Sequence, residues 1–275
     1  MTATRTLSMN LATTRGAWGF AEAVDGCLKH GITAISPWRD QVEAIGLKEA
    51  ARIVKSNGLR VTGLCRGGMF PAETAEGRQN NIDDNLRAID EAAALGADCL
   101  VLVVGGLPGS SRDIVDARKM VADGIAAMLP HARASGVPIA IEPLHPMYAA
   151  DRACVNTIDQ ALDICAALGE GVGVAIDVYH VWWDPRLAEA IARAGQMQRI
   201  FAHHICDWLV PTQDLLLDRG MMGDGVIDLK GIRTLIEGAG YSGPQEVEIF
   251  SRDDWWKRPG DELVSTVVER FNSVC

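Results

Sequence analysis

The sequence predicts a single (β/α)₈ barrel, and three observations support this prediction. Short apolar runs alternate with longer amphipathic stretches along the whole chain, and this alternation is typical of parallel sheets built from right-handed βαβ crossovers. Eight such units in 275 residues leave about 34 residues for each, the usual size in this fold. No linker rich in Pro, Gly or Ser interrupts the pattern. We therefore expect residues 1–275 to form one domain.

Eight candidate strands follow one another along the chain, each a mostly apolar run of four to six residues. They are Leu7–Asn10, Ile32–Ser36, Arg60–Cys65, Cys99–Val104, Pro138–Glu142, Gly173–Asp177, Ile200–Ile205 and Gln245–Ile249. Helical stretches such as Asp83–Leu95 and Thr157–Leu168 lie between them. In the second stretch, Ile158, Leu162 and Cys165 share one helical face, and its first residue is a suitable N-cap.

A doubly wound open sheet is the alternative fold, and the glycine pattern argues against it. In that fold a Gly-rich phosphate-binding turn follows the first strand, but here the segment 11–16 reads Leu-Ala-Thr-Thr-Arg-Gly. The pairs Gly67-Gly68 and Gly105-Gly106 do not have GxGxxG spacing either. The barrel is therefore the favoured prediction.

The composition limits the classes of partner. Lys and Arg total 26 against 36 Asp and Glu, so the formal net charge is −10 and the pI about 5.1. This balance disfavours binding to nucleic acid or to anionic membranes. Seven scattered cysteines without a CxxC pair indicate buried thiols in a reducing compartment. The N-terminus lacks an apolar signal-peptide core, so we expect a soluble, cytoplasmic protein whose partner is a small molecule.

Four consecutive strand ends carry side chains that can bind a metal ion. They are Glu142, Asp177, His204 and Glu248. In a barrel the active site lies at the carboxyl ends of the strands, and neighbouring strands bring such side chains to one point. Three carboxylates and one imidazole make an oxygen-rich site, for which Mn²⁺ is the expected ion and Mg²⁺, Co²⁺ or Zn²⁺ are also compatible.

Each of these residues alone has a simpler interpretation. Asp177 could cap the helix that follows it. His203 and His204 point to opposite sides of one strand, and a single buried histidine is more often a hydrogen-bonded core residue than a ligand. Four such residues on four consecutive strand ends are harder to explain in this way, and together they favour a metal site.

Several segments resemble the xylose-isomerase-like TIM barrels, the sugar isomerase and epimerase superfamily. The segments are IEPLHP (141–146), AIDVYH (175–180), HHICD (203–207) and the long stretch 218–250 that ends in PQEVEIF. Within the superfamily, the nearest group is that of the 2-keto-myo-inositol (inosose) isomerases. The resemblance implies that Glu142, Asp177, His204 and Glu248 are the metal ligands. It selects His204 because this histidine precedes Asp207 by three residues, as in the family's HxxD motif.

The resemblance also implies substrate-binding residues. These are His180, three residues after the aspartate of the sixth strand, and Arg219, ahead of Gly223-Asp224-Gly225. Ketose 3-epimerases of the family carry an arginine six residues after the metal-binding histidine. Val210 stands at that position here, which disfavours epimerisation of a free ketohexose at C3.

Other residues are weaker candidates for the substrate pocket. His145 contacts the substrate or caps the next helix, and Trp183 belongs to a set of tryptophans that either form the wall of a sugar site or pack between barrel and helices. The set is Trp38, Trp182, Trp183, Trp255 and Trp256. Arg66, in the segment Cys65-Arg66-Gly67-Gly68, points into the pocket or lies on an exposed loop.

The activity implied by the resemblance is a metal-dependent isomerisation or epimerisation of a keto-sugar or keto-cyclitol. Glu142 and Glu248 would be the catalytic acid/base pair that removes a proton α to a carbonyl and returns it, through a metal-bound enediolate. A lyase on the same scaffold, an inosose dehydratase or an enzyme that cleaves 3-keto-glycosides, is the alternative. Six histidines and the acidic charge argue against a DNA-cleaving hydrolase of the superfamily. A sugar-binding protein without metal is the last alternative, and homo-oligomers are common in the family.

Overall fold

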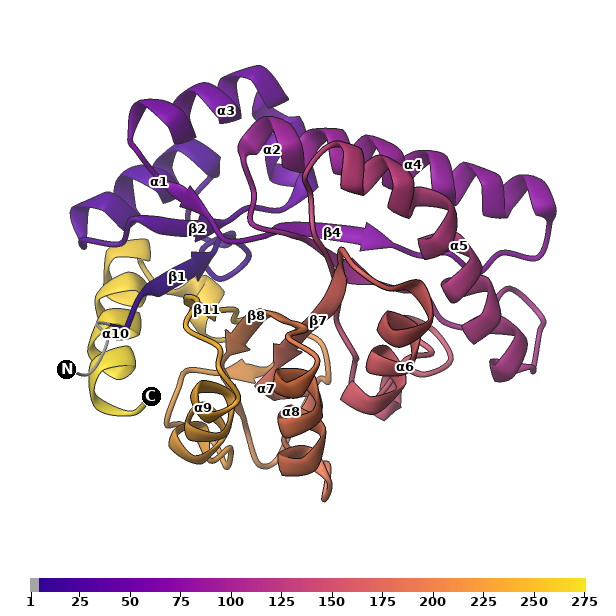
Figure 1. Cartoon of the computed structure of the whole chain (residues 1–275). Coiled ribbons are helices and arrows are strands. Elements are labelled where there is room, and N and C mark those ends of the chain that lie inside the picture. The colour runs from indigo at the N-terminus through magenta and orange to yellow at the C-terminus, as the bar shows by residue number, and fades with distance from the viewer. Residues whose placement is uncertain (1–4) are drawn as a thin grey trace.

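The strands of the chain close into one barrel, as a computed structural model that describes residues 5–275 shows (Figure 1). The main sheet has the order β3-β2-β1-β11-β8-β7-β6-β5-β4, and all of its neighbouring strands are parallel. Its two end strands, β3 (Arg60–Val61) and β4 (Leu64–Gly68), are consecutive pieces of one barrel strand. Because β3 pairs with β2 and β4 with β5, the ring closes. The predicted (β/α)₈ barrel is confirmed.

The observed strands match the eight predicted ones closely. The remaining strands of the barrel are β1 (Leu7–Asn10), β2 (Ala34–Ser36), β5 (Leu100–Val103), β6 (Ile139–Ile141), β7 (Val172–Asp177), β8 (Ile200–Ile205) and β11 (Gln245–Val247). A separate antiparallel pair, β9 (Asp207–Trp208) and β10 (Arg219–Gly220), follows β8. This pair carries Arg219 to the carboxyl end of the barrel.

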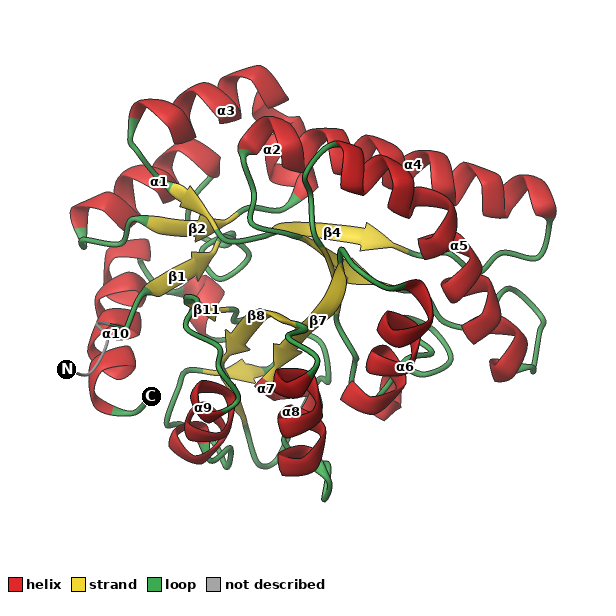
Figure 2. Ribbon diagram, viewed as in Figure 1, coloured by secondary structure: helices red, strands yellow, loops and turns green. Residues whose placement is uncertain are grey.

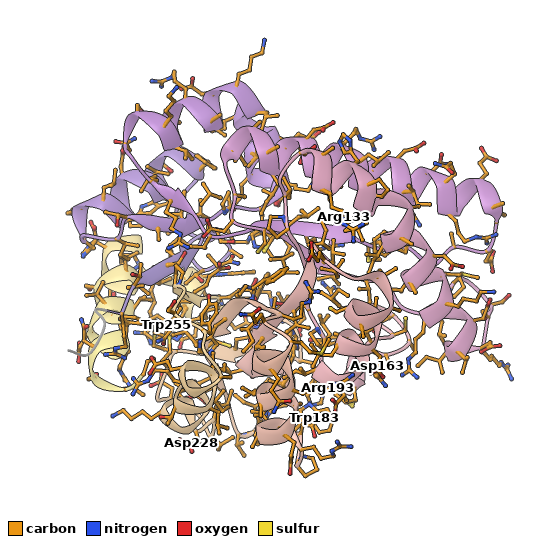
Figure 3. All side chains as sticks on the ribbon, in the orientation of Figure 1. Arg133, Asp163, Trp183, Arg193, Asp228 and Trp255 are labelled. Atoms are coloured by element: carbon orange, nitrogen blue, oxygen red, sulfur yellow. The ribbon has the colours of Figure 1, made fainter. Side chains whose placement is uncertain are left out.

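The helices surround the strands as an outer ring (Figure 2). They are α1 (Phe20–Lys29), α2 (Arg39–Ile45), α3 (Leu47–Ser56), α4 (Ala75–Leu95), α5 (Ile114–Ala134), α6 (Ile158–Leu168), α7 (Val178–Val181), α8 (Leu187–Gln196), α9 (Leu229–Gly238) and α10 (Gly260–Ser273), with 3₁₀ turns η1 (Pro146–Tyr148) and η2 (Trp255–Lys257). Arg193 of α8 reaches Asp163 of α6 at 2.6 Å, which ties two neighbouring helices together (Figure 3). Among the described residues, no helix is both long and apolar enough to span a membrane.

One helix is longer than the sequence predicts. The stretch predicted at Asp83–Leu95 begins at Ala75, because the Thr74 side chain accepts a hydrogen bond from Gly77 N at 3.0 Å and caps the helix there. The polar first turns of α4 carry no apolar periodicity, so the sequence pattern alone missed them.

Small side chains fill a layer of the barrel interior. Cys65, Cys99, Val101, Ala140, Ala175 and Ala202 form a buried cluster of their own, against which Trp38 and Phe201 pack. The register pairs Val101 with Ala140 and Ala175 with Ala202 across neighbouring strands, so the layer is level around the barrel.

We predict that Ala175→Leu destabilises the protein by about 1–3 kcal/mol, because three additional carbon atoms overfill this layer. Ala126→Leu, on the exposed face of α5, is the matched control and should change the free energy of unfolding by less than about 0.5 kcal/mol. Urea unfolding of both variants measures this, and equal midpoints would show that the layer is loosely packed.

Candidate metal centre and active site

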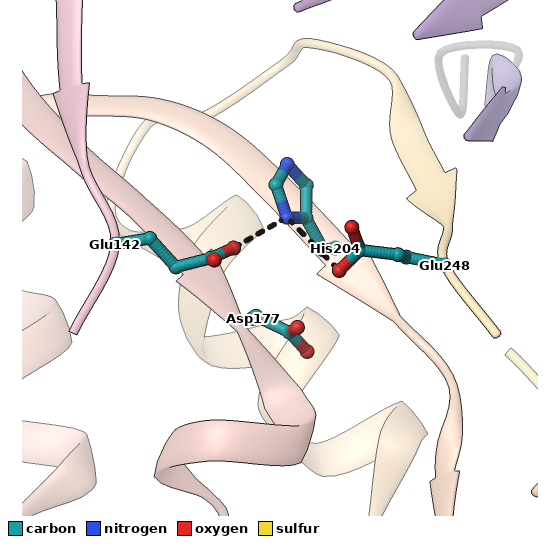
Figure 4. A group of neighbouring side chains, drawn as sticks. All are labelled: Glu142, Asp177, His204 and Glu248. Carbon is teal, nitrogen blue, oxygen red and sulfur yellow. Dashed lines mark hydrogen bonds and ion pairs between the residues drawn. The ribbon is translucent and has the colours of Figure 1, made fainter. Parts of the chain in front are cut away.

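The four predicted ligand side chains converge at the carboxyl end of the barrel (Figure 4). Glu142, Asp177, His204 and Glu248 each offer one ligand atom, and these atoms all lie within 4.8 Å of one another. The Nδ1 atom of His204 is 2.8 Å from Glu142 Oε1 and 4.0 Å from Glu248 Oε2. All four side chains are buried. The structure therefore brings together the residues that the strand-end pattern selects.

The strand order explains this convergence. The strands β6, β7, β8 and β11 are consecutive neighbours in the sheet, so Glu142 and Glu248 come from the two ends of the arc, with Asp177 and His204 between them. Asp177 and His204 are register partners on adjacent strands. Asp177 is also the N-cap of α7, since its Oδ1 accepts from Tyr179 N at 2.8 Å. The capping interpretation is therefore correct, but it uses one oxygen and leaves Oδ2 facing the site.

His203 and His204 face opposite ways, as expected for neighbours on a strand. The ring of His203 lies edge-on to Tyr241, with the ring centroids 6.4 Å apart. His204 points into the barrel, where Nδ1 faces the ligand group and Nε2 lies 3.6 Å from Glu246 Oε1 without a hydrogen-bond partner among the described residues. Only His204 is therefore placed to bind a metal ion in this site.

Arg219 and His180 flank the ligand group. Arg219 Nη1 donates to Asp177 Oδ2 at 2.8 Å and to Glu248 Oε2 at 3.0 Å, and its guanidinium is buried over the ring of Tyr179. His180 Nδ1 accepts from the backbone N–H of His145 at 3.2 Å. His180 Nε2 lies 3.1 Å from Arg219 Nη2, and a guanidinium can only donate, so both ring nitrogens of His180 meet N–H donors. Arg219 thus contacts both His180 and the ligand carboxylates.

Burial and charge set the protonation of these groups. Burial, with a contribution from Glu142, raises the pKa of Glu248 to about 8 against the opposing effect of Arg219. Burial alone would raise the pKa of Asp177, but Arg219 and His180 outweigh it and lower the pKa to about 2. Burial lowers the pKa of His180 to about 3, so this ring is neutral at pH 7. For His204, three surrounding carboxylates overcome burial and raise the pKa well above its ordinary value.

The other predicted substrate residues lie around the ligand group. His145 is half-buried and stacks on Trp208 with ring centroids 5.0 Å apart. It also accepts from Met147 N at 3.2 Å as the N-cap of η1. Trp183, labelled in Figure 3, directs Nε1 to the carbonyl oxygen of His180 at 2.8 Å and meets His145 edge-on. Both residues therefore brace His180.

The tryptophans predicted as a set divide between two places. Trp38 donates from Nε1 to Asn10 Oδ1 at 2.8 Å and packs against Phe250, so it lies beside the site. Trp182 packs on Trp208. Trp255 is buried under Arg258, and Trp256 donates to the carbonyl oxygen of Ala12, which makes these two packing residues.

Sequence reasoning missed a buried polar group next to the ligands. Glu246 is 2 % exposed and accepts from Asn10 Nδ2 at 2.7 Å and from Thr62 Oγ1 at 2.8 Å. Asn10 also donates to Glu248 Oε1 at 3.0 Å. The alternation of acidic and apolar residues in EVEIF (246–250) could have revealed Glu246, because residues two apart on a strand point to the same side. Asn10 ends the first strand and had no such signal.

The charge balance of the group fits a divalent cation. Glu142, Asp177, Glu246 and Glu248 are four buried carboxylates, and among residues 5–275 the buried cations beside them are Arg219 and protonated His204. If all four carboxylates were ionised, their charges would exceed those of the two cations by two, and such an excess in a low-dielectric interior is costly without a counter-ion. Three carboxylates and an imidazole are also a donor set that Mn²⁺ and Zn²⁺ accept.

A family described as the xylose isomerase-like TIM barrels matches residues 24–272. The chain belongs to this family. The match confirms the resemblance that the strand-end motifs indicate. A crystal structure of a Sinorhizobium meliloti 1021 protein that carries only a systematic name is 75 % identical, covers 98 % of both chains and superposes with a TM-score of 0.97.

Two further relatives carry functional names. An inosose isomerase of Halalkalibacterium halodurans is 29 % identical over 143 residues, which are 49 % of this chain and 47 % of that protein, so the match spans about half of its length. The IOLI protein, whose crystal structure contains a zinc atom, has a TM-score of 0.83 at 23 % identity over 98 % of this chain and 97 % of that one. This second likeness shows the shared fold.

The raised pKa values predict how the metal-free protein responds to pH. Between about pH 6.5 and 8, folded Glu248 and His204 hold protons that the unfolded chain releases, so stability falls as pH rises. His180 and His203 are neutral in the folded protein and are protonated in the unfolded chain only below about pH 6.5, so they make stability rise with pH only in that range. We expect the urea midpoint in EDTA to fall across this range and the slope to be shallower in Glu248→Gln.

The exposed Glu269→Gln variant of α10 is the control and should keep the slope of the wild type. Saturating Mn²⁺ should flatten the slope, because the cation favours the ionised carboxylates. A slope that is the same in wild type and Glu248→Gln would contradict this assignment.

Proposed function

We propose that this protein is a divalent-metal-dependent isomerase or epimerase of a keto-sugar or keto-cyclitol, of the inosose type. The observation that carries the proposal is the convergence of Glu142, Asp177, His204 and Glu248 within 4.8 Å, flanked by Arg219 and His180. The named relatives add support, since one is an inosose isomerase and the other a zinc-binding protein of the same fold.

The metal would be held by Glu142, Asp177, His204 and Glu248. When bound, a divalent cation supplies Lewis acidity, which makes a proton α to a ketone easier to remove. Mn²⁺ is our expectation for the ion, because carboxylate oxygens form most of the donor set. The hydrogen bonds of Asn10 to Glu248 and of Arg219 to Asp177 hold two of the ligand carboxylates in position.

His180 and Arg219 would orient the substrate. Arg219 Nη2 and His180 Nε2 lie 3.1 Å apart, so one substrate oxygen at this place would lie beside both groups. A substrate carbonyl or hydroxyl oxygen in this position would acquire negative charge as the proton leaves, and preorganised donors stabilise such charge.

Glu142 and Glu248 would move the proton. They come from opposite ends of the four-strand arc, so they can face the two sides of a planar enediolate. A carboxylate on one side removes the α proton, and return of this proton to the neighbouring carbon gives isomerisation. Return of a proton to the original carbon from the opposite face gives epimerisation. Loss of a β-hydroxyl or of a glycosidic oxygen would make the enzyme a lyase, so the products identify the reaction.

The test is proton exchange in D₂O, followed by NMR on keto-inositols, ketohexoses and 3-keto-glucosides with Mn²⁺ or with EDTA. We expect incorporation of deuterium that requires Mn²⁺ and falls at least about 100-fold in Glu248→Gln, the usual contribution of a general base. Glu269→Gln, on the surface of α10, should exchange like the wild type.

The negative outcomes separate the alternatives. Metal binding without exchange on any of these compounds would contradict enolisation and favour a hydrolase. Failure to bind Mn²⁺ or Zn²⁺ by calorimetry would contradict the four-ligand site and leave a sugar-binding protein.

A further inference from the structure

Two arginines at the carboxyl end of the barrel have no partner for their charge among the described residues. Arg66 lies in β4, where the register with β5 shifts between Cys65 and Gly67. Arg152 lies in the loop between η1 and α6. Both are half-buried, and neither side chain forms a hydrogen bond or ion pair within residues 5–275. The Nε atom of Arg152 is buried without any partner in that part of the chain.

The two arginines lie in neighbouring segments. The backbone N–H of Gly105 donates to the carbonyl oxygen of Arg152 at 2.9 Å, and Gly105 lies beside Met69, three residues after Arg66.

The charges around Arg66 agree with this placement. Burial and the charge of Arg152 lower the pKa of Arg66, and the opposing charge of Asp40 is the weakest of these influences. Asp40 already pairs with Arg15 at 3.4 Å. Half-buried cations held together without an acid are costly, so this arrangement indicates a place for an anion.

Arg66 lines a cleft of about 490 Å³. Its charged lining is Arg15, Arg39, Arg66, Asp40 and Asp84. The acids are already paired, since Asp84 binds Arg39 at 2.8 Å and Asp40 binds Arg15. One arginine therefore stays uncompensated in the cleft, and Arg152 adds a second charge nearby, on a chain whose net charge is −10.

Two residues that line the cleft contact Asn10, which is hydrogen-bonded to Glu248 of the candidate metal site. Cys65 lines the cleft, and its Sγ lies 3.7 Å from Asn10 Nδ2, which donates to Glu248. Trp38 lines it as well and donates to the other end of Asn10.

Arg152 is connected to the same site from the other side. Its guanidinium lies 5.8 Å from the ring centroid of Tyr148, and that ring is edge-on to His180 with centroids 5.9 Å apart. Tyr148 is therefore the side chain that lies between Arg152 and His180.

We propose that Arg66 and Arg152 bind an oxyanion of the substrate, so that the substrate is a keto-sugar or keto-cyclitol bearing a carboxylate or a phosphate. The inference rests on the proposed function and specifies its substrate class. Four buried carboxylates repel an anion from the metal site itself, which leaves the edge of the pocket for the charged end of the molecule. Arginine suits this role because its planar group donates in parallel to two oxygens.

The anion site can be tested without knowledge of the substrate. The Nε–H signals of ¹⁵N-labelled arginines are followed by NMR in the Mg²⁺-loaded protein during titration with D-gluconate, inorganic phosphate or D-glucose. We expect both anions to shift Arg66 and Arg152 and leave Arg52, a surface arginine of α3 paired with Glu49, unchanged. Glucose should shift none of the three. The tighter of the two anions identifies carboxylate or phosphate as the recognised group.

Variants show whether both arginines act together. Arg66→Met and Arg152→Met should each weaken the anion on the order of ten- to a hundredfold, as expected for one charged hydrogen-bond donor. Arg66→Lys should retain part of the affinity, and Arg52→Met should bind like the wild type. The proposal would be overturned if neither anion shifts the Nε–H signals of Arg66 and Arg152, or if the anions shift the signal of Arg52 equally.

Proton exchange on charged and neutral ketoses separates this proposal from the proposed function. D-fructose, D-fructose 6-phosphate and 5-keto-D-gluconate are compared in D₂O with Mn²⁺. Exchange that favours a charged ketose and loses this preference in Arg66→Met supports both proposals. Exchange without a response of Arg66 and Arg152 overturns the anion site alone. A response of these arginines to anions without exchange on any ketose overturns the proposed function alone.

Discussion

The concentration of negative charge at the carboxyl end of the barrel is the constraint on which the rest of the site depends. Four carboxylates are buried there, and Glu142, Asp177 and Glu248 bring ligand atoms within 4.8 Å of one another and of His204. Such a group is tolerated only if cations and hydrogen-bond donors surround it. Arg219 bridges Asp177 and Glu248, His204 contacts Glu142, and Asn10 bridges Glu246 and Glu248. A divalent ion would complete this balance.

The barrel supplies the rigidity that this charge requires. The ligands come from four adjacent strands, whose ladders fix the positions of the ligand backbones. The antiparallel pair β9 and β10 carries Arg219 back over the site, and Asp207 holds this excursion by accepting from the backbone of Gly223 and Ile227. The acidic residue of the HxxD motif therefore has a structural role, since it fixes the segment that positions the arginine.

The two ends of the pocket carry opposite charge. The interior is negative and suits a cation, whereas the edge at Arg66 and Arg152 is positive in a chain of net charge −10. A substrate with its carbonyl near the cation and an oxyanion at the edge would match both regions. This division would also favour a charged ketose over a neutral one, which leaves the arginines unpaired, because buried polar groups without partners discriminate strongly.

The barrel and the candidate ligand residues could be predicted from the sequence, because both depend on local patterns repeated along the chain. Strand ends that each carry one acid or histidine can be recognised one unit at a time. Other features depend on contacts between distant segments and are visible only in the folded protein. They are the oxygen of Asp177 that caps α7, the burial of Glu246 against Asn10 and Thr62, and the lack of partners for Arg66 and Arg152 within residues 5–275. These features join residues up to 236 positions apart, and no local periodicity encodes such neighbours. Charge balance in a buried site is a property of the folded surroundings, so only the closed barrel reveals it.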